Sequence, residues 1–377
     1  MRLPAGLLGV LVCLPLLVCA SAQAATSPWR VIPSPNQGAG DNGLGAVSAV
    51  SLTDAWALGA GTTSILLLHW NGSSWANVAS QLPDPHAPLE SLYTQGALVV
   101  LASAPKRNIG ITVESTNGVG WSESVIPLPP GMHYSGLATV SYVTALSQQD
   151  VWAAASKINL TTDYQMIYLD HWNGSTWQKH LIQKWGEECS AGITHLQAFA
   201  PTSVWAAGQV ACPDGSVDFA DGWNGTTVGG GCVPGDSSAD LVNVAGFGVP
   251  PGHPADAWTV GDWRTYSPAA EGPIAADGQC QTLPLPNSYP TDHSFIAIAP
   301  ASATTAWAVG TRVSGSAQDN LMEYWNGSTW TEWGGPNPTT QNTLAAAVAV
   351  PGQAGSFWAV GNTGQNPTRT LILHCCS

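Results

Sequence analysis

The chain has 377 residues, of which only 9% are charged. Its 24 Asp and Glu residues outnumber its 10 Lys and Arg residues and give a formal net charge of −14. This acidic balance argues against nucleic acid and anionic membrane surfaces as partners. Cations, basic proteins and neutral glycans stay open. The 41 Gly, 28 Pro and 18 Trp residues favour short strands, tight turns and aromatic packing between sheets.

The N-terminal segment has the features of a secretory signal peptide. Arg2 is followed by an apolar run over 7–19 and then by small residues. That run is too short to span a bilayer, and small residues are typical of a cleavage site. We expect residues 1–24 to be removed and 25–377 to form one extracellular domain without a membrane span. A lipid anchor at Cys19 is an alternative, although the residue before it is larger than lipidation sites prefer.

A short motif around a tryptophan recurs along the rest of the chain. From its second copy on, successive tryptophans are 53, 53, 49 and 51 residues apart. The first gap is 96 residues, close to two units, and the apolar segment 97–102 fills it with Val99 in the place of the tryptophan. The chain therefore contains seven units. The tryptophans that define the other six are Trp56, Trp152, Trp205, Trp258, Trp307 and Trp358.

A second marker, Trp-Asn-Gly, follows most of these tryptophans by 14 to 20 residues. Because Asn-Gly favours positive φ, it predicts a two-residue hairpin turn. Four copies also match the glycosylation acceptor pattern, as does Asn159, but the turn explains those four without a glycan. The asparagines of the four copies are Asn71, Asn173, Asn224 and Asn326.

Each unit is predicted to form four antiparallel strands. An innermost strand such as 344–350 leads to the tryptophan strand, then to a third strand such as 65–70, and then to a fourth that begins near Trp75. Four such strands in about 50 residues are typical of a propeller blade. We therefore expect an all-β, seven-bladed β-propeller. Six or eight blades are the alternatives if the second unit is misread.

The two ends of the chain are predicted to share the last blade. The seventh unit ends with the strand 371–375, and no fourth strand follows it. Segment 29–35 matches the residues that follow Trp75 in the first unit. Pairing this N-terminal strand with the last blade would close the ring and cover an exposed strand edge.

These motifs resemble those of secreted bacterial repeat proteins, which are grouped with Kelch-like and Asp-box propellers. Units of those proteins read Asp-Val-Trp-Ala-Val-Gly and then His-Trp-Asn-Gly-Thr-Ser-Trp. The corresponding segments here are 54–59, Asp-Ala-Trp-Ala-Leu-Gly, and 171–177, His-Trp-Asn-Gly-Ser-Thr-Trp. The resemblance covers nearly all of the chain after the signal peptide. It implies a propeller but little about function, because propellers have many unrelated activities.

Six cysteines remain after removal of the signal peptide, and an exported protein is expected to form disulfides. We favour Cys189–Cys212, because both residues lie in loops that emerge on one face of the propeller. Cys232–Cys280 is the next pair, on outer strands of neighbouring blades. The adjacent cysteines at 375 and 376 could be free, bonded to each other or intermolecular. The ligand spacing is too wide for a zinc cluster, so no metal site is predicted.

Candidate functional residues lie in the loops where the repeats differ. Several precede innermost strands and are expected to converge at the channel mouth, although solvated loop residues would look the same. These are His86, His133, Tyr134, Glu187, Glu188, Asp240, Asp292 and His293. A second candidate is an aromatic segment that could stack on a sugar or a protein, formed by Trp263, Arg264 and Tyr266. Asp54, Asp150 and Asp256 are interpreted as turn-capping residues.

The sequence favours a monomeric binding or scaffolding module that contacts a protein or glycan through its loop-rich face. The alternative is an extracellular hydrolase or lyase that acts on glycans at the channel mouth. No motif of a known catalytic class supports the alternative. No cofactor is expected, and calcium in the acidic stretch 214–240 is a weaker possibility.

Overall fold

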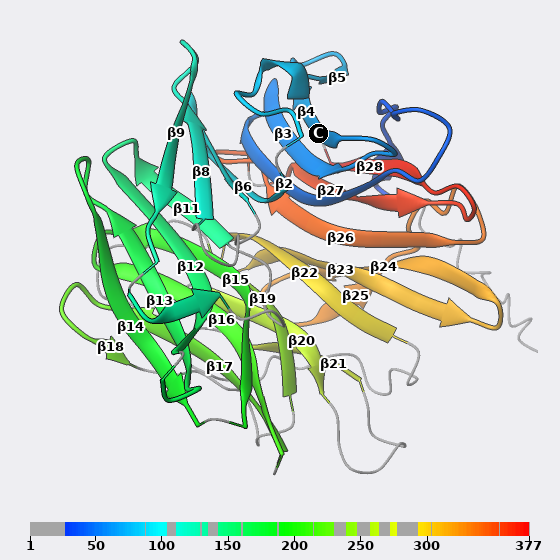
Figure 1. Cartoon of the computed structure of the whole chain (residues 1–377). Helices are drawn as coiled ribbons and strands as arrows, with labels where there is room; N and C mark the ends of the chain where they lie inside the picture. The colour runs from blue at the N-terminus through cyan, green and yellow to red at the C-terminus, as the bar shows by residue number, and fades with distance from the viewer. Residues whose placement is uncertain are drawn as a thin grey trace, which may run out of the picture.

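The computed structural model describes residues 27–86, 88–103, 111–128, 130–134, 142–159, 161–186, 188–213, 215–229, 239–246, 257–263, 272–276, 293–302, 304–353 and 355–376. Within these ranges the chain is built from β-strands, and one 3-10 helix, η1 (Ala79–Gln81), is the exception. The strands form seven antiparallel sheets, which lie around a common centre in Figure 1. None of the described helices is long and apolar enough to cross a membrane.

The first three sheets follow one another along the chain. Sheet 1 contains β2 (Gly43–Ser51), β3 (Asp54–Ala60), β4 (Ile65–Trp70) and β5 (Trp75–Asn77). Sheet 2 contains β6 (Leu89–Gln95), β7 (Leu98–Ser103), β8 (Ile111–Thr116) and β9 (Trp121–Ile126). Sheet 3 contains β10 (Met132–Tyr134), β11 (Tyr142–Ser147), β12 (Asp150–Asn159), β13 (Gln165–Trp172) and β14 (Trp177–Trp185).

The other four sheets continue this order. Sheet 4 contains β15 (Ser190–Ala200), β16 (Ser203–Cys212), β17 (Gly215–Trp223) and β18 (Val228–Gly229). Sheet 5 contains β19 (Ala239–Gly246), β20 (Ala257–Trp263) and β21 (Gly272–Ala276). Sheet 6 contains β22 (His293–Ser302), β23 (Thr305–Ser314), β24 (Ala317–Trp325) and β25 (Trp330–Glu332), and sheet 7 contains β26 (Asn342–Ala349), β27 (Phe357–Thr363), β28 (Arg369–Cys375) and β1 (Trp29–Val31).

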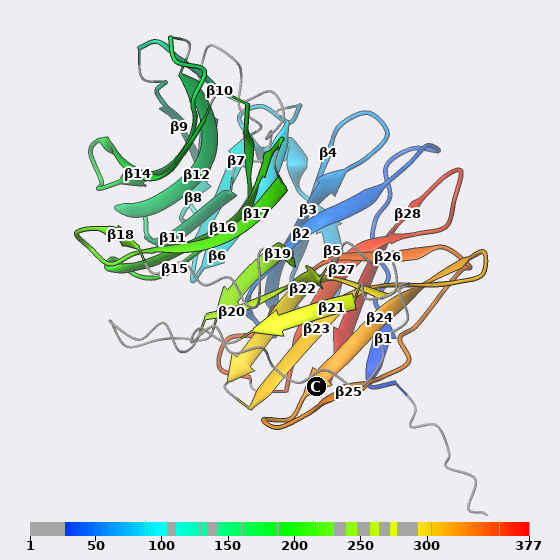
Figure 2. The same cartoon turned by 90° about the horizontal axis from the view of Figure 1, so that it is seen from below.

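The innermost strands β2, β6, β11, β15, β19, β22 and β26 contact one another in that order, and β26 contacts β2. Figure 2 shows successive sheets side by side when the molecule is seen from below. Small antiparallel sheets arranged radially in this way form a β-propeller. The core lies between neighbouring sheets, because alternate side chains of a strand point to opposite faces. Thus Trp152 and Ala154 pack toward sheet 4, whereas Val151 and Ala153 pack toward sheet 2.

Six innermost strands contain a β-bulge at the same place in the repeat. One extra residue of the strand lies opposite the glycine, or the serine in sheet 2, that ends the tryptophan motif. A Cβ atom on Gly310 would overlap the carbonyl oxygen of Ser294, so in sheet 6 the backbone beside the bulge leaves room for glycine alone. The bulged residues are Gly45, Glu90, Thr194, Val242, Ile296 and Ala345.

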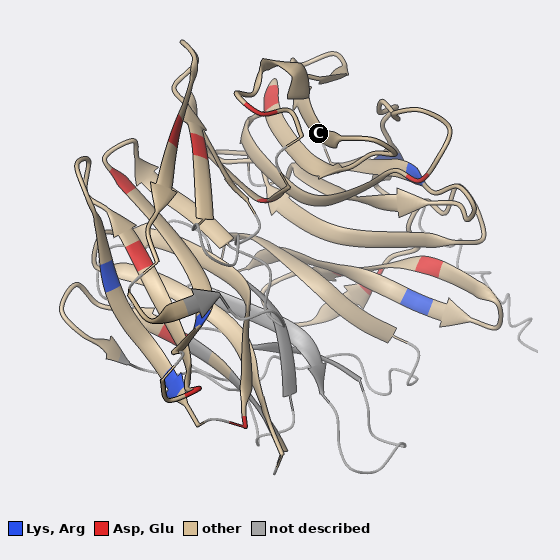
Figure 3. Cartoon of the chain, in the orientation of Figure 1, with Lys and Arg blue, Asp and Glu red and all other residues tan. Residues whose placement is uncertain are grey.

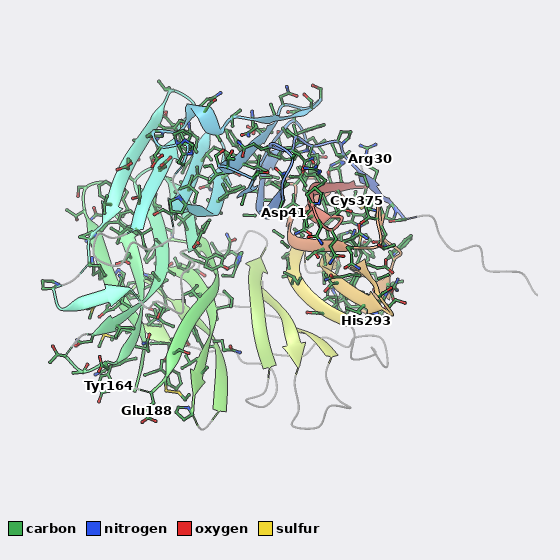
Figure 4. The ribbon with its side chains drawn as sticks, turned by 45° about the vertical axis from the view of Figure 1, so that its right-hand side comes forward. Arg30, Asp41, Tyr164, Glu188, His293 and Cys375 are labelled. Atoms are coloured by element: carbon green, nitrogen blue, oxygen red, sulfur yellow. A yellow bond between two sulfur atoms is a disulfide. The ribbon has the colours of Figure 1, made fainter. Side chains whose placement is uncertain are left out.

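The N-terminal strand completes the last sheet, as predicted. β1 pairs antiparallel with β28, and Figure 4 shows Arg30 of β1 beside Cys375 of β28. The pairing continues beyond β1, because the Ile32 amide donates to the Ile372 carbonyl at 2.8 Å. Trp29 is 4% exposed, and its ring meets that of Trp307 edge to face, with 5.3 Å between centroids. Trp29 therefore packs at the contact between sheets 6 and 7.

Two predictions of local structure are wrong. In β7 the residue in the place of the tryptophan is Val100, not Val99: Val100 pairs with Tyr93 as Trp56 pairs with Ser48. The Asn-Gly hairpins have four-residue turns over 71–74, 173–176, 224–227 and 326–329, rather than two-residue turns. The asparagine side chain accepts hydrogen bonds from two amides across each turn and so stabilises the longer connection.

The predicted disulfide Cys189–Cys212 is confirmed, with 4.2 Å between the Cα atoms. It connects the segment before β15 to the end of β16. Figure 4 places Glu188, next to this disulfide, at the same edge of the molecule as Tyr164 of the β12–β13 loop. The adjacent cysteines at 375 and 376 are bonded to each other. Cys232 and Cys280 lie outside the described residues, so their pairing stays a prediction.

Candidate functional site

A cavity of about 300 Å³ lies between the innermost strands. Residues of β2, β6, β11, β15, β22 and β26 line it, and β26 contributes small and apolar side chains over 345–349. The polar side chains come mainly from three adjacent strands. The larger ones are Glu90 and Tyr93 of β6, Tyr142 of β11, and His195 and Gln197 of β15. We call this space the channel pocket.

Glu90 reaches the channel pocket because it is the bulged residue of β6. The bulged residues of four other sheets line the pocket as well, and they are Gly45, Thr194, Ile296 and Ala345. A bulge turns its extra residue out of the regular alternation of the strand and can re-aim that side chain. Among the described residues that line the pocket, Glu90 is the acidic one.

The Glu90 carboxyl group is partly buried and lacks a hydrogen bond from the described residues at one of its oxygen atoms. Burial raises its pKa from the ordinary value of 4.5. Its Oε2 atom is buried and has no hydrogen-bond partner within the described part of the chain. A buried carboxylate without a partner is unfavourable, so this position would be stabilised by a cation or a hydrogen-bond donor.

The aromatic groups beside Glu90 are uncharged near neutral pH. Burial, and then the negative charge of Glu90, raise the pKa of Tyr142 to about 12. Burial lowers the pKa of His195 to about 4, and its ring lies 5.6 Å from that of Tyr142 between centroids. Burial also raises the pKa of Tyr93, although hydrogen bonds to Thr144 and Gln197 act in the opposite direction. The described lining of the pocket therefore combines one acid with neutral aromatic and amide groups.

The described lining of the pocket places one carboxyl group beside tyrosine rings. No group of three or more metal-ligating side chains occurs among the described residues. Tyrosine faces and a carboxylate together attract an ammonium or guanidinium group.

Of the residues predicted from the loops, those with described side chains, His86, Glu188 and His293, do not line the channel pocket. His86 is exposed in the β5–β6 connection, where its amide donates to Asp84 Oδ1 at 2.9 Å. His293 is the first residue of β22 and is 8% exposed, at the edge labelled in Figure 4. His133 and Tyr134 lie in β10, which pairs with the far end of β12.

The remaining loop candidates are only partly described. Trp263 ends β20, and Asp240 lies in β19. Glu188 is exposed. Arg264, Tyr266, Glu187 and Asp292 lie outside the described residues. The calcium prediction rests on a stretch in which residues 214 and 230–238 also lie outside them. A role of these residues in binding stays a prediction.

Sequence reasoning missed the channel pocket, although one signal was available. The innermost strand 344–350 is rich in alanine, and Glu90 departs from that pattern in the segment Leu89-Glu90-Ser91. The bulge that turns its side chain into the pocket depends on strand register, which no sequence motif marks.

The aspartates of the tryptophan motif bind side chains within their own sheets. Asp150 Oδ1 accepts hydrogen bonds from Trp152 Nε1 at 2.7 Å and from His171 Nε2 at 3.0 Å. The His171 ring stacks on Trp152 with 3.9 Å between centroids. Asp54 makes the same two contacts in sheet 1. These aspartates therefore orient aromatic rings, and the turn-capping interpretation is wrong for both; Asp256 lies outside the described residues.

No protein-family model matches the chain, and no curated protein matches its sequence. Solved structures do match. YCF48 bound to D1 peptide has a TM-score of 0.55 and 16% identity, covering 94% of this chain and 98% of that one. A protein of unknown function from Dyadobacter fermentans has a TM-score of 0.49 and 10% identity, covering 93% and 100%. A six-bladed fucose-binding lectin from Aleuria aurantia has a TM-score of 0.42 and 10% identity, covering 86% and 90%. At 16% identity, the similarity to YCF48 supports the fold alone.

Proposed function

We propose that the protein is a secreted binding propeller that holds a protein partner by taking one cationic side chain into the channel pocket. The observation that carries this proposal is Glu90. Its side chain lies among neutral, aromatic residues in the described lining of the pocket, and one of its oxygen atoms is buried without a partner among the described residues. A lysine or arginine side chain would supply the missing partner. A volume of about 300 Å³ suits one side chain rather than a long ligand.

The architecture that we propose for it is a closed ring of seven blades, acting as a monomer. The cyclic contacts of the innermost strands and the pairing of β1 with β28 support this blade count. Export rests on the signal peptide predicted for residues 1–24.

The charge of the molecule favours a basic partner. The formal net charge is −14, and Figure 3 shows acidic residues on several sheets beside few basic ones. Basic proteins are therefore attracted over long distances before contact. The propeller YCF48, which has a similar fold, was solved with a bound peptide. A neutral glycan partner and a glycan hydrolase find less support in the channel pocket, because neither explains a single buried acid.

A peptide selection tests this proposal. A library of short linear peptides is selected on the immobilised protein and on its Glu90→Gln variant. We expect peptides enriched in lysine or arginine from the unchanged protein, and loss of that enrichment with Glu90→Gln. Glu188→Gln removes an exposed acid outside the pocket and serves as the control. The proposal fails if Glu90→Gln selects the same basic peptides as the control.

A further inference from the structure

The contact between sheets 1 and 2 lacks a tryptophan that the corresponding contact between sheets 7 and 1 contains. There, Trp358 of β27 meets Trp70 and Trp75, with 5.3 and 5.2 Å between ring centroids. In sheet 2 the place of Trp70 is taken by Thr116, which pairs with Trp121 as Trp70 pairs with Trp75. A large ring is thereby replaced by a small side chain.

A groove of about 460 Å³ occupies this contact. Its lining includes Trp56 of β3, Trp121 of β9 and Thr116 of β8. Trp56 is partly exposed. The tryptophans in the same place of sheets 3, 6 and 7 are buried, at 0%, 2% and 1% exposure, and Trp205 of sheet 4 is partly exposed. The divergent second unit therefore opens a site at a position where the tryptophans of sheets 3, 6 and 7 are buried.

The groove also exposes the hydrogen-bonded aspartate of sheet 1. The side chains of Asp54 and His69 are 38% and 32% exposed, whereas those of Asp150 and His171 in sheet 3 are both 18% exposed. Asp54 Oδ1 accepts hydrogen bonds from Trp56 Nε1 at 3.0 Å and from His69 Nε2 at 3.1 Å. These bonds fix the carboxylate beside the indole ring, on the wall of the groove.

We propose that this groove is a second binding site, for a neutral pyranose sugar. The apolar face of a pyranose ring stacks on an indole, and Trp56 and Trp121 offer two. Sugar hydroxyls donate hydrogen bonds to a carboxylate, and Asp54 is held in place to accept them. Because Asp54 already accepts two N–H groups, it is suited to a neutral donor more than to a full positive charge. The site is independent of Glu90 and of the channel pocket.

Saturation-transfer NMR with D-glucose, D-galactose, D-mannose, L-fucose and N-acetyl-D-glucosamine tests the site. We expect at least one of these sugars to bind. Thr116→Trp restores the ring found in the other sheets and should abolish that binding. Asp54→Asn should weaken it about tenfold, as expected for loss of a charge-assisted hydrogen bond. Asp150→Asn changes the matched aspartate of sheet 3 and should leave sugar binding unchanged.

Two results would overturn the inference. One is the absence of binding for all five sugars to the unchanged protein. The other is sugar binding that Thr116→Trp and Asp54→Asn leave intact, with the fold of each variant verified by thermal unfolding. Choline, tested in parallel, distinguishes a cation site: displacement of the sugar signal by choline also contradicts a neutral-sugar site. Glu90→Gln should not change sugar binding, so the two sites are tested separately.

Discussion

At the scale of single residues, the glycine of the tryptophan motif links the repeat to the channel pocket. In sheet 7 this glycine, Gly361, lies against the bulged innermost strand, and the bulge brings Ala345 to the pocket wall. In sheet 2 the bulge that brings Glu90 there lies opposite Ser103. A Cβ atom on Gly361 would overlap the carbonyl oxygen of Thr343. The glycine of the motif therefore leaves room for the β-bulge of the neighbouring strand and supplies no chemical group of its own.

Gly361→Ala tests this account. We expect the substitution to lower the free energy of unfolding by about 3 kcal/mol, because the new methyl group can be accommodated only if backbone moves. A Cβ atom on Gly334 meets nothing within 4 Å, so Gly334→Ala should change stability little. Urea unfolding of both variants measures the difference. Equal stability of the two would show that the bulge does not require glycine.

The buried carboxyl group of Glu114 in β8 makes the free energy of unfolding depend on pH. It is 0% exposed, and burial, followed by the charges of Glu123 and Asp84, raises its pKa to about 7. Its stabilising contribution is therefore complete below pH 4.5 and is lost as pH rises through 7. Glu114→Gln should be more stable than the unchanged protein at pH 8, by up to about 3 kcal/mol, with the gain disappearing below pH 4.5.

Urea unfolding at pH 4 and pH 8 measures this difference. Glu188→Gln, which changes an exposed acid, should have the same free energy of unfolding as the unchanged protein at each of the two pH values. A gain for Glu114→Gln that is equal at both pH values would contradict the role assigned to its ionisation.

At the scale of elements, β1 is short but connects the two ends of the chain. Its three residues pair with β28, and the segment after it adds bonds from the Thr370 amide to Asn36 and from the Thr368 amide to Asp41, at 2.9 and 2.7 Å. Trp29 contributes the buried side chain of this strand. The closing contact thus combines backbone pairing with one large apolar group.

Trp29→Ala should lower the free energy of unfolding by about 3 kcal/mol, because it leaves a cavity between sheets 6 and 7. Val31→Ala in the same strand should cost less than about 0.5 kcal/mol, because Val31 is 45% exposed. Thermal and urea unfolding of both variants measure these effects. Similar losses for the two would show that the indole ring does not anchor β1.

At the scale of the whole molecule, the repeat predicts the fold because each copy contains the same strands. The third strand expected over 65–70 is β4 with the same bounds, and the N-terminal strand pairs as expected. The prediction was wrong in the unit that has no motif tryptophan. Without a tryptophan in β7, the sequence does not show whether Val99 or Val100 takes its place. The turns were misjudged because the Asn71 side chain stabilises a longer connection than Asn-Gly alone suggests.

The candidate sites were harder to predict than the fold, because they arise where copies differ within regular elements. Glu90 enters the channel pocket through a bulge, and Thr116 opens a groove by being smaller than the tryptophan of other sheets. Neither feature lies in the variable loops to which sequence reasoning assigned function. Both residues differ from those at the corresponding positions of the other units, and this difference is visible in the sequence. Which cavity each side chain lines depends on the packing of the sheets, which the sequence does not show.

The central claim is that the Glu90 carboxyl group binds a cation, and its own titration tests this most directly. Carboxyl-carbon NMR of glutamate-labelled protein, with the Glu90 signal assigned by its loss in Glu90→Gln, measures the pKa with and without N-acetyl-lysine methylamide. We predict a pKa above 4.5 in the free protein, falling when the lysine compound is added and unchanged by its norleucine analogue. A Glu90 pKa that the lysine compound does not lower would contradict the account.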